Sequence, residues 1–202
     1  MTVGNILNKR LMKPVYRNAN YAAFYVNEPF SVKGSNLGAH SQKDFCYYQM
    51  LKAWKVSDSE FKFIDAHSKT YNVRDDSDWE RTLKPRLHER LRQSVNLILF
   101  LSSNTANSRA LREEIHYAIN VLYLPVIVIY PDYSNLSDIY DNNDFTYNVK
   151  KLWDKLPIFR DNKYKVPVLH IPMLKEYIKR ALNDRDLRIT TKCDSGDYYY
   201  KH

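Results

Sequence analysis

The sequence predicts an α/β domain built on a parallel β-sheet with helices on both faces. Short apolar runs alternate along the chain with segments whose apolar residues recur at helical spacing, and this alternation is typical of β-α-β units. The run Val95–Leu101 is apolar with one exception, as a central strand covered on both faces requires. A length of 202 residues fits one such domain.

Five strands are expected in this domain. The runs that predict them are Tyr21–Val26, Phe61–Ile64, Val95–Leu101, Val126–Tyr130 and Val166–Ile171. The segments between them predict helices over 41–55, from Ser77 onward, after Ser108, and over 149–156 and 174–182. Ser77 and Glu80 have the spacing of a capping box, and Pro85 predicts a kink or restart in the helix that follows. The three tyrosines at 198–200 favour an edge strand or a packing tail.

Charge and composition limit the classes of function. The net charge of +8 is compatible with nucleic acid or with a phosphate-bearing small ligand. Much of this charge lies in 81–92, where a solvated helix face is the simpler interpretation, and no basic motif interleaved with aromatic residues accompanies it. The two cysteines suggest neither disulfides nor a zinc site, and the apolar runs are too short to span a bilayer. We therefore expect a cytoplasmic protein.

Several enzyme classes are disfavoured because their motifs are missing. The sequence contains no G-x-G-x-x-G, no G-x-x-x-x-G-K-[ST] and no G-x-S-x-G. A kinase, a Rossmann oxidoreductase and an α/β-hydrolase are therefore not expected. The six histidines do not cluster at metal-ligand spacing, so no metal site is predicted.

The helix after Ser108 places one carboxylate where it can face a ligand. Its apolar stripe contains Leu111 and Ile115 and continues to residue 122. On a helical wheel Glu113 lies almost opposite this stripe, toward solvent, whereas Glu114 lies at the margin of the buried face. Ligands of open α/β sheets bind at the carboxyl ends of the strands, which is where this helix begins. Geometry alone leaves two interpretations of Glu114 equally open, a functional carboxylate and a structural one paired with an arginine.

The segment 99–118 resembles the third strand and following helix of TIR-like domains, in the bacterial branch that includes TIR-like proteins of Thoeris antiphage defence. The matching pattern is a hydrophobic strand, Ser-x-x-Thr, Asn-Ser, and then Glu114-Ile-x-x-Ala118. Phe24-Tyr25, Asp44-Phe45 and Asp65 fit earlier blocks of the family, so that the resemblance covers roughly residues 20–131. It departs from many TIR enzymes in having Ala110 and Leu111 where those have tryptophan and cysteine.

The resemblance implies a flavodoxin-like five-stranded parallel sheet and an enzyme that uses NAD⁺ as its substrate, without a further cofactor. Active members cleave the nicotinamide–ribose bond, acting as glycohydrolases, cyclases or transferases of ADP-ribose. Glu114 corresponds to their catalytic glutamate. The residues expected to bind substrate are Phe24 and Tyr25 at the nicotinamide or ribose, Ser103 and Ser108 at ribose or phosphate, and Asp65 and His67 in a mobile loop over the site.

The resemblance also implies a partner and leaves alternatives open. A diffusible nucleotide product would activate a separate effector protein, and self-association is expected, whereas membrane and nucleic acid are not. The expected organisation is a leader over 1–19, a TIR-like domain over 20–185 and a C-terminal tail over 186–202. A non-catalytic scaffold that self-associates is the main alternative, and a nucleic-acid-binding module is the weaker one.

Overall fold

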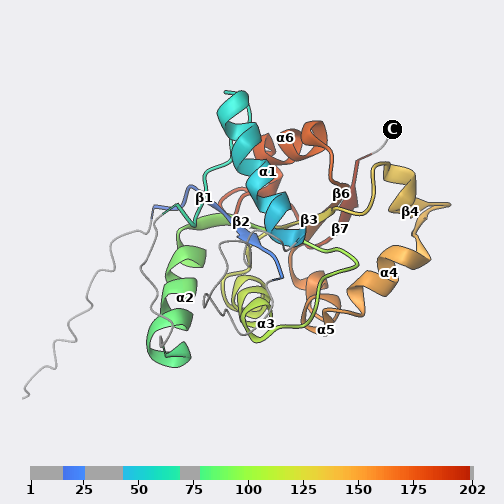
Figure 1. Ribbon diagram of the computed structural model, residues 1–202. Coiled ribbons are helices and arrows are strands. Elements are labelled where there is room, and N and C mark those ends of the chain that lie inside the picture. The colour runs from blue at the N-terminus through green and yellow to red at the C-terminus, as the bar shows by residue number, and fades with distance from the viewer. Residues whose placement is uncertain (1–15, 26–42, 69–77, 201–202) are drawn as a thin grey trace, which may run out of the picture.

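A computed structural model describes residues 16–25, 43–68 and 78–200 of the chain. Figure 1 shows one central sheet with helices on both sides. The strands of this sheet are parallel and follow the order β1-β2-β3-β6-β7. Their bounds are β1 Ala19–Ala23, β2 Ser94–Phe100, β3 Val126–Tyr130, β6 Pro167–Pro172 and β7 Gly196–Tyr199. The predicted α/β class with a five-stranded parallel sheet is therefore confirmed.

The predicted second strand, Phe61–Ile64, is reduced to a single bridge beside β1. Asp65 pairs in parallel with Asn20, and the N–H of Asn20 donates to the carbonyl of Ile64 at 2.6 Å. The N–H of Ile64 donates to the side chain of Asn20 at 2.8 Å rather than to backbone, and the N–H of Phe63 turns back to the carbonyl of Phe61. These local bonds satisfy backbone groups that a regular ladder would use. The segment nevertheless occupies the position outside β1 that the second strand of a flavodoxin-like sheet takes.

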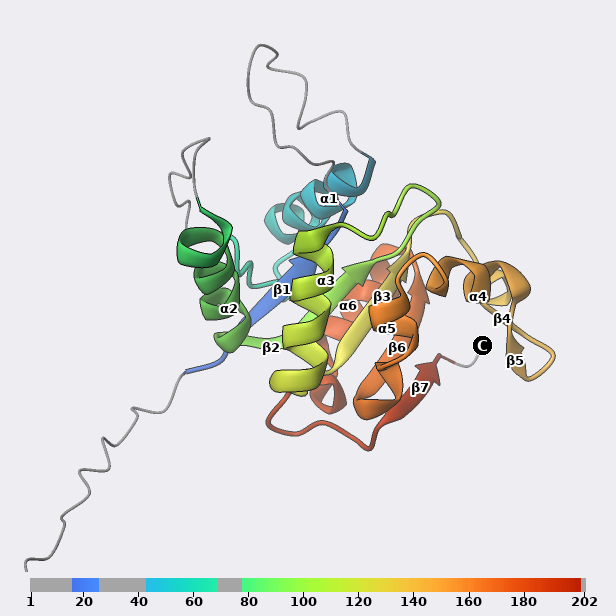
Figure 2. The ribbon, with the colours of Figure 1, turned by 90° about the horizontal axis from the view of Figure 1, so that it is seen from below.

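Helices cover both faces of the sheet, as Figures 1 and 2 show. Helices α1 and α6 lie on one face, and α2, α3 and α5 lie on the other. The helix bounds are α1 Lys43–Ser57, α2 Lys84–Arg92, α3 Arg109–His116, α4 Tyr147–Trp153, α5 Pro157–Arg160 and α6 Lys175–Asn183. Alternate residues of β2 enter two separate cores, Leu97 and Leu99 on the α3 side and Ile98 and Phe100 on the α1 side. In the part of the chain that the structure describes, none of the helices has the length and apolarity to cross a membrane.

The helix before β2 restarts at Pro85, as the sequence predicts. A π-helical turn over Trp79–Leu83 precedes α2, whose first turn contains the proline. The cap of this turn is Asp78, whose carboxylate accepts from the N–H of Arg81 at 2.7 Å. Ser77, predicted as the cap, lies outside the described residues.

Strand β7 lies within 186–202, the segment that was predicted to be a C-terminal tail. β7 pairs with β6 along its whole length, and the N–H of Ile189 donates to the carbonyl of Val95. Tyr198 and Tyr199 therefore lie in an edge strand, as one of the two interpretations predicted. The polar segment after β3 forms a small hairpin, β4 Tyr140–Asp141 and β5 Asp144–Phe145. Most of the predicted leader, 1–15, lies outside the described residues.

A chain of hydrogen bonds that begins in the core and ends at a partly exposed aspartate attaches β7 to the sheet. The indole N–H of Trp153 donates to the hydroxyl of Tyr130 at 2.8 Å, and Tyr130 bonds Nδ1 of His170 at 2.7 Å. Nε2 of His170 bonds the carboxylate of Asp197 on β7 at 3.0 Å, and Lys163 also pairs with Asp197. Burial would raise the pKa of Asp197, but His170 and Lys163 more than offset it and lower that pKa. The charged carboxylate therefore stabilises the fold at neutral pH.

Replacing Asp197 by alanine is expected to destabilise the protein by about 2 kcal/mol, because a buried imidazole N–H and an ammonium group both lose their acceptor. Chemical denaturation at pH 7 measures the change. Asp144, whose ion pair with Lys150 is exposed, provides the control, and its alanine variant should unfold at nearly the wild-type midpoint. Equal midpoints for both variants would show that this chain of hydrogen bonds does not anchor β7.

Candidate active site

The topology of the sheet fixes where a ligand can bind. The chain leaves β1 toward the outer segment at Phe61–Ile64 and then crosses back to β2 on the other side, so the switch point lies between β1 and β2. In open α/β sheets the crevice outside the carboxyl ends of such strands is the usual ligand site. Helix α3 begins beside the carboxyl ends of these strands, and Ser108 caps it by accepting from the N–H of Leu111 at 3.2 Å.

Glu114 lies in the second turn of α3 and is bonded to the first strand. The hydroxyl of Tyr21 on β1 donates to Oε1 of Glu114 at 2.8 Å, across 93 positions of sequence. Tyr21 is only 1% exposed, whereas Glu114 is half-buried, as the helical wheel predicts. The carboxyl group is thus fixed from inside the protein while part of the side chain still reaches solvent.

The surroundings of Glu114 favour its neutral form. Burial raises the pKa of Glu114 to about 8, while the hydrogen bond from Tyr21 and the positive charge of Arg90 oppose the rise. Glu114 is half-buried as a residue, but its carboxyl group is closely surrounded by protein. The loss of water around this group therefore has the largest effect on its pKa. Burial and the neighbouring carboxylate also hold the pKa of Tyr21 well above its usual value, so its hydroxyl remains a donor across the physiological range. A carboxyl group that titrates near neutral pH beside a crevice is a candidate catalytic group.

The neighbouring residue Glu113 has a different environment, and its side chain does not face solvent as predicted. It was expected to face solvent, but α2 packs against that side of α3. Its carboxylate bonds Nε2 of His88 at 2.7 Å and pairs with Lys84 at 3.5 Å. Burial acts to raise the pKa of Glu113, and His88 and Lys84 outweigh it and lower the value. Glu113 is therefore a charged structural residue, and part of the basic stretch 81–92 is engaged in holding α2 to α3.

Asp65 and His67 lie beside β1, in the described start of the loop that was expected to be mobile. The carboxylate of Asp65 accepts from the hydroxyl of Tyr48 at 2.7 Å and from the N–H of His67 at 2.9 Å. The His67 ring packs against Tyr21 with 4.6 Å between ring centroids, and its Nε2 bonds the carbonyl of Ala22 at 2.9 Å. Both residues are fixed to the strand that carries Tyr21.

Phe24 and Tyr25 leave β1 toward opposite faces of the sheet. Phe24 stacks on Tyr48 at 5.1 Å and packs among the residues of the α1 side. Tyr25 packs against the core on the α3 side, which is the side of Glu114. Of the two predicted pocket aromatics, the structure therefore places Tyr25 on the face of Glu114 and Phe24 on the other.

Ser103 begins the loop after β2 and is exposed. Its N–H donates to the carboxylate of Asp132 at 2.6 Å, and its carbonyl accepts from Lys155 at 2.6 Å. These contacts hold the backbone of the loop and involve residues that follow β3 and α4. The hydroxyl of Ser108, although it accepts from Leu111, can still donate to a ligand.

A buried aspartate that the sequence did not single out as a site residue ties the crevice together. Asp44 at the start of α1 is 2% exposed and accepts from the hydroxyls of Ser102 at 2.7 Å and Thr105 at 3.3 Å. A backbone hydrogen bond from Tyr25 reaches the same carboxylate. Burial raises the pKa of Asp44, while these three bonds oppose the rise. Asp44 thus joins the end of β1 to the loop between β2 and α3.

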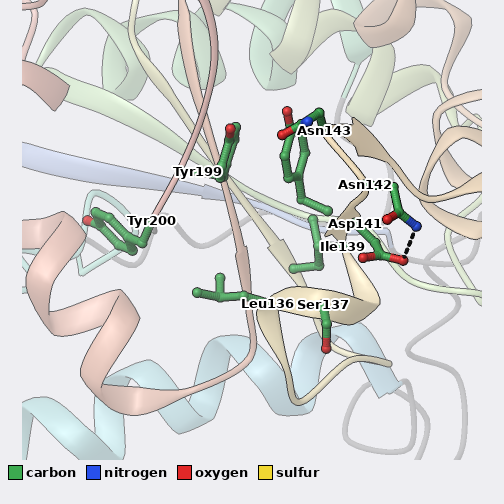
Figure 3. A pocket seen from close by; sticks show the side chains of 9 residues that line it. Leu136, Ser137, Ile139, Asp141, Asn142, Asn143, Tyr199 and Tyr200 are labelled. Atoms are coloured by element: carbon green, nitrogen blue, oxygen red, sulfur yellow. Dashed lines mark hydrogen bonds between the residues drawn. The ribbon is translucent and has the colours of Figure 1, made fainter. Parts of the chain in front are cut away.

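Two hollows of about 400 Å³ lie elsewhere on the surface. One lies between the β4–β5 hairpin and β7, and Figure 3 shows the residues that line it, among them Leu136, Ile139 and Tyr199. The other is lined by Asn18, Phe61 and Arg188. Neither is lined by Glu114, and β7 is at the far edge of the sheet from β1. None of the predicted site residues lines either hollow.

A family model matches residues 21–136, more than half of the chain, and its description is the TIR-like domain of the Thoeris protein ThsB. The chain belongs to this family. The matched range begins at Tyr21 and contains Asp44, Asp65 and Glu114. The suspected resemblance to Thoeris TIR-like proteins is therefore confirmed.

The matched range also contains the whole switch-point crevice of this TIR-like domain. It runs from β1 through β3 and ends at Leu136. Strands β6 and β7 complete the central sheet beyond it. The candidate site is thus built from residues within the matched range.

Proposed function

We propose that this Thoeris TIR-like protein cleaves the nicotinamide–ribose bond of NAD⁺ and thereby makes a nucleotide signal in antiphage immunity. The observation that supports the proposal is the carboxyl group of the half-buried residue Glu114, bonded to Tyr21 on the strand beside the switch point of the sheet. The position matches the catalytic glutamate of active TIR-like enzymes.

The chemistry suits a single carboxylate. The bond between the ribose anomeric carbon and the nicotinamide nitrogen breaks, and nicotinamide leaves as a neutral molecule with the bonding electrons. Positive charge then develops on the ribose, in an oxocarbenium-like transition state. A carboxylate nearby stabilises this charge, and the effect is large where water is partly excluded. Water, or a nucleophilic atom of the same nucleotide, then forms the new bond and releases a proton.

NAD⁺ itself favours the ionised form of Glu114. Its nicotinamide ring carries a positive charge, and an opposite charge within a few ångströms lowers the pKa of a carboxyl group. Binding of the substrate therefore converts a largely neutral group into the carboxylate that the transition state requires.

The remaining predicted residues are proposed to bind the rest of the substrate. Tyr25, which packs on the same face of the sheet as Glu114, is proposed to contact the nicotinamide or ribose. Ser103 and Ser108 border the start of α3 and are proposed to contact ribose or phosphate. Phe24, Asp65 and His67 support this arrangement from the side of β1, through ring packing and the contacts with Tyr48 and Ala22.

The product is proposed to diffuse to a separate effector protein. Cleavage alone gives ADP-ribose, whereas closure by an atom of the same nucleotide gives a cyclic product. The protein is proposed to act in the cytoplasm, where NAD⁺ is available, and without a resident cofactor.

The experiment is to incubate the purified protein with NAD⁺, in buffer and in an extract of phage-infected cells, and to resolve the products by mass spectrometry. Release of nicotinamide together with an ADP-ribose-derived product supports the enzyme. Intact NAD⁺ in both settings, with protein that is folded by circular dichroism, would favour the alternative of a non-catalytic scaffold that self-associates.

A further inference from the structure

Around Glu114 the structure brings together three residues from three different segments. Tyr21 comes from β1, His67 from the loop after Asp65, and Arg90 from α2. Tyr21 donates to Glu114 at 2.8 Å, and its ring packs on His67 at 4.6 Å between centroids. A guanidinium nitrogen of Arg90 lies 3.4 Å from Nδ1 of His67. Glu114 itself lies close enough to Arg90 for that charge to act on its carboxyl group.

The partners of His67 fix its protonation. The carbonyl of Ala22 can only accept, so Nε2 of His67 must carry the proton and donate to it. The guanidinium can only donate, so Nδ1 must be the unprotonated acceptor. Both contacts are satisfied only by the neutral ring with its proton on Nε2. Burial and the charge of Arg90 lower the pKa of His67, in agreement with this form.

A neutral His67 gives Arg90 a fixed position without cancelling its charge. A carboxylate in place of the imidazole would pair with the guanidinium and remove its influence on Glu114. His67 is in turn fixed to the residue that follows Tyr21, through the carbonyl of Ala22. Tyr21, His67 and Arg90 are thus connected to one another, and Tyr21 also bonds the Glu114 carboxyl group directly.

The two groups that act on Glu114 both favour the carboxylate. The hydroxyl of Tyr21 donates to Oε1, and the guanidinium supplies positive charge. On its own helix the adjacent Glu113 is engaged by His88 and Lys84 on the other side of α3.

We infer that Tyr21, His67 and Arg90 are positioning residues that fix the orientation of the Glu114 carboxyl group and favour its ionised form. The inference rests on the proposed function for its catalytic meaning, whereas the arrangement itself is a property of the protein without substrate. Tyr21 and Arg90 act on Glu114 directly, and His67 acts by holding Arg90 against β1.

The test is to titrate the Glu114 carboxyl group directly, by NMR of protein with ¹³C-labelled glutamate side chains, assigning the signal by its loss in Glu114→Gln. Tyr21→Phe removes one hydroxyl and leaves the ring that packs on His67. We expect this change to raise the midpoint of the Glu114 titration by about one pH unit. Arg90→Gln should raise it too, and it provides a second variant if Tyr21→Phe does not fold.

Tyr117→Phe is the matched control. The hydroxyl of Tyr117, at the start of the π-helical turn that follows α3, accepts from Arg92 at 2.9 Å in an exposed contact, so its removal deletes a tyrosine–arginine contact that does not include Glu114. The Glu114 titration should be unchanged in this variant. An unchanged titration in both Tyr21→Phe and Arg90→Gln would overturn the inference.

The steady-state readout separates this inference from the proposed function. In Tyr21→Phe we expect kcat at pH 7 to fall about 10-fold with KM changed less than about 3-fold, and activity to be partly restored at higher pH. A shifted titration with unchanged kcat and pH profile in an active protein would contradict the inference. Wild-type protein that leaves NAD⁺ intact would remove the proposed function, and the titration would still decide whether these residues control Glu114.

Discussion

Replacing Glu114 by glutamine is expected to reduce nicotinamide release from NAD⁺ by at least about 100-fold, because the amide keeps the shape of the side chain but cannot carry negative charge. The amide oxygen can still accept from the hydroxyl of Tyr21, so the packing of α3 on β1 should be retained. The loss should therefore appear mainly in kcat, where an interaction made in the transition state is measured.

Glu113→Gln is the matched control for this loss of activity. It changes the same chemical group one position earlier on α3, but on the side that bonds His88 and Lys84. Nicotinamide release by this variant should stay within a few-fold of wild type. If both variants lost activity equally, disturbance of the helix would explain the result, and if Glu114→Gln kept full activity, Glu114 would not be catalytic.

The same Glu114→Gln variant is expected to be more stable than wild type at alkaline pH. The folded pKa of Glu114 is about 8, above the 4.5 of an unperturbed glutamate. Below pH 4.5 Glu114 is neutral in both the folded and the unfolded protein and does not change the free energy of unfolding. Between pH 4.5 and 8 it ionises only in the unfolded protein, so the free energy of unfolding falls as the pH rises. Above pH 8 this reduction is constant. Each unit of pKa difference corresponds to about 1.4 kcal/mol. Because Glu114 retains some exposure, we expect a gain of about 2–3 kcal/mol for the variant at pH 9.

Denaturant unfolding of both proteins between pH 4 and 9 measures this gain. The two free energies of unfolding should converge below pH 4.5 and separate above it. Glu113→Gln should change stability in the opposite direction at neutral pH, because the lowered pKa of Glu113 means that its charged form stabilises the fold. A constant difference between Glu114→Gln and wild type across the whole range would contradict a raised pKa for Glu114.

Helical periodicity was sufficient to predict where Glu114 lies, and the resemblance to TIR-like domains singled it out as the candidate catalytic residue. The apolar stripe of α3 places Glu114 at its margin, and the structure finds it half-buried there. Its partner could not be found in the same way. Every residue of β1 is buried, so a tyrosine in this strand looks like an ordinary core residue. Only the packing of α3 on β1, across 93 positions, shows that the hydroxyl of Tyr21 reaches Glu114.

The role of Asp44 was hidden for a similar reason. The sequence places it at the start of a helix, where an aspartate is common. Its hydrogen-bond partners Ser102 and Thr105 are 58 and 61 positions away, so the network depends on the tertiary fold.

The two edges of the sheet were the least predictable part of the fold. Phe61–Ile64 has the composition of a strand, but the side chain of Asn20 takes hydrogen bonds that a ladder would use. β7 begins with Gly196 and Asp197 and has no aliphatic residue. It is held to the sheet in part by the pairing of Asp197 with His170 and Lys163. Central strands are specified by their apolar residues, whereas edge strands depend on single polar contacts with distant residues.

The central claim is that a carboxyl group with a raised pKa, that of Glu114, carries the cleavage of NAD⁺. The most direct test is the pH dependence of kcat/KM for nicotinamide release by the wild-type protein, since this ratio reports the ionisation of the free enzyme. The account predicts that kcat/KM rises with pH to a half-maximum near 8, and that the midpoint for kcat is lower because bound NAD⁺ favours the carboxylate. A profile that is flat from pH 6 to pH 9 (about the stable range of NAD⁺ assays), or one that falls with pH, would contradict it.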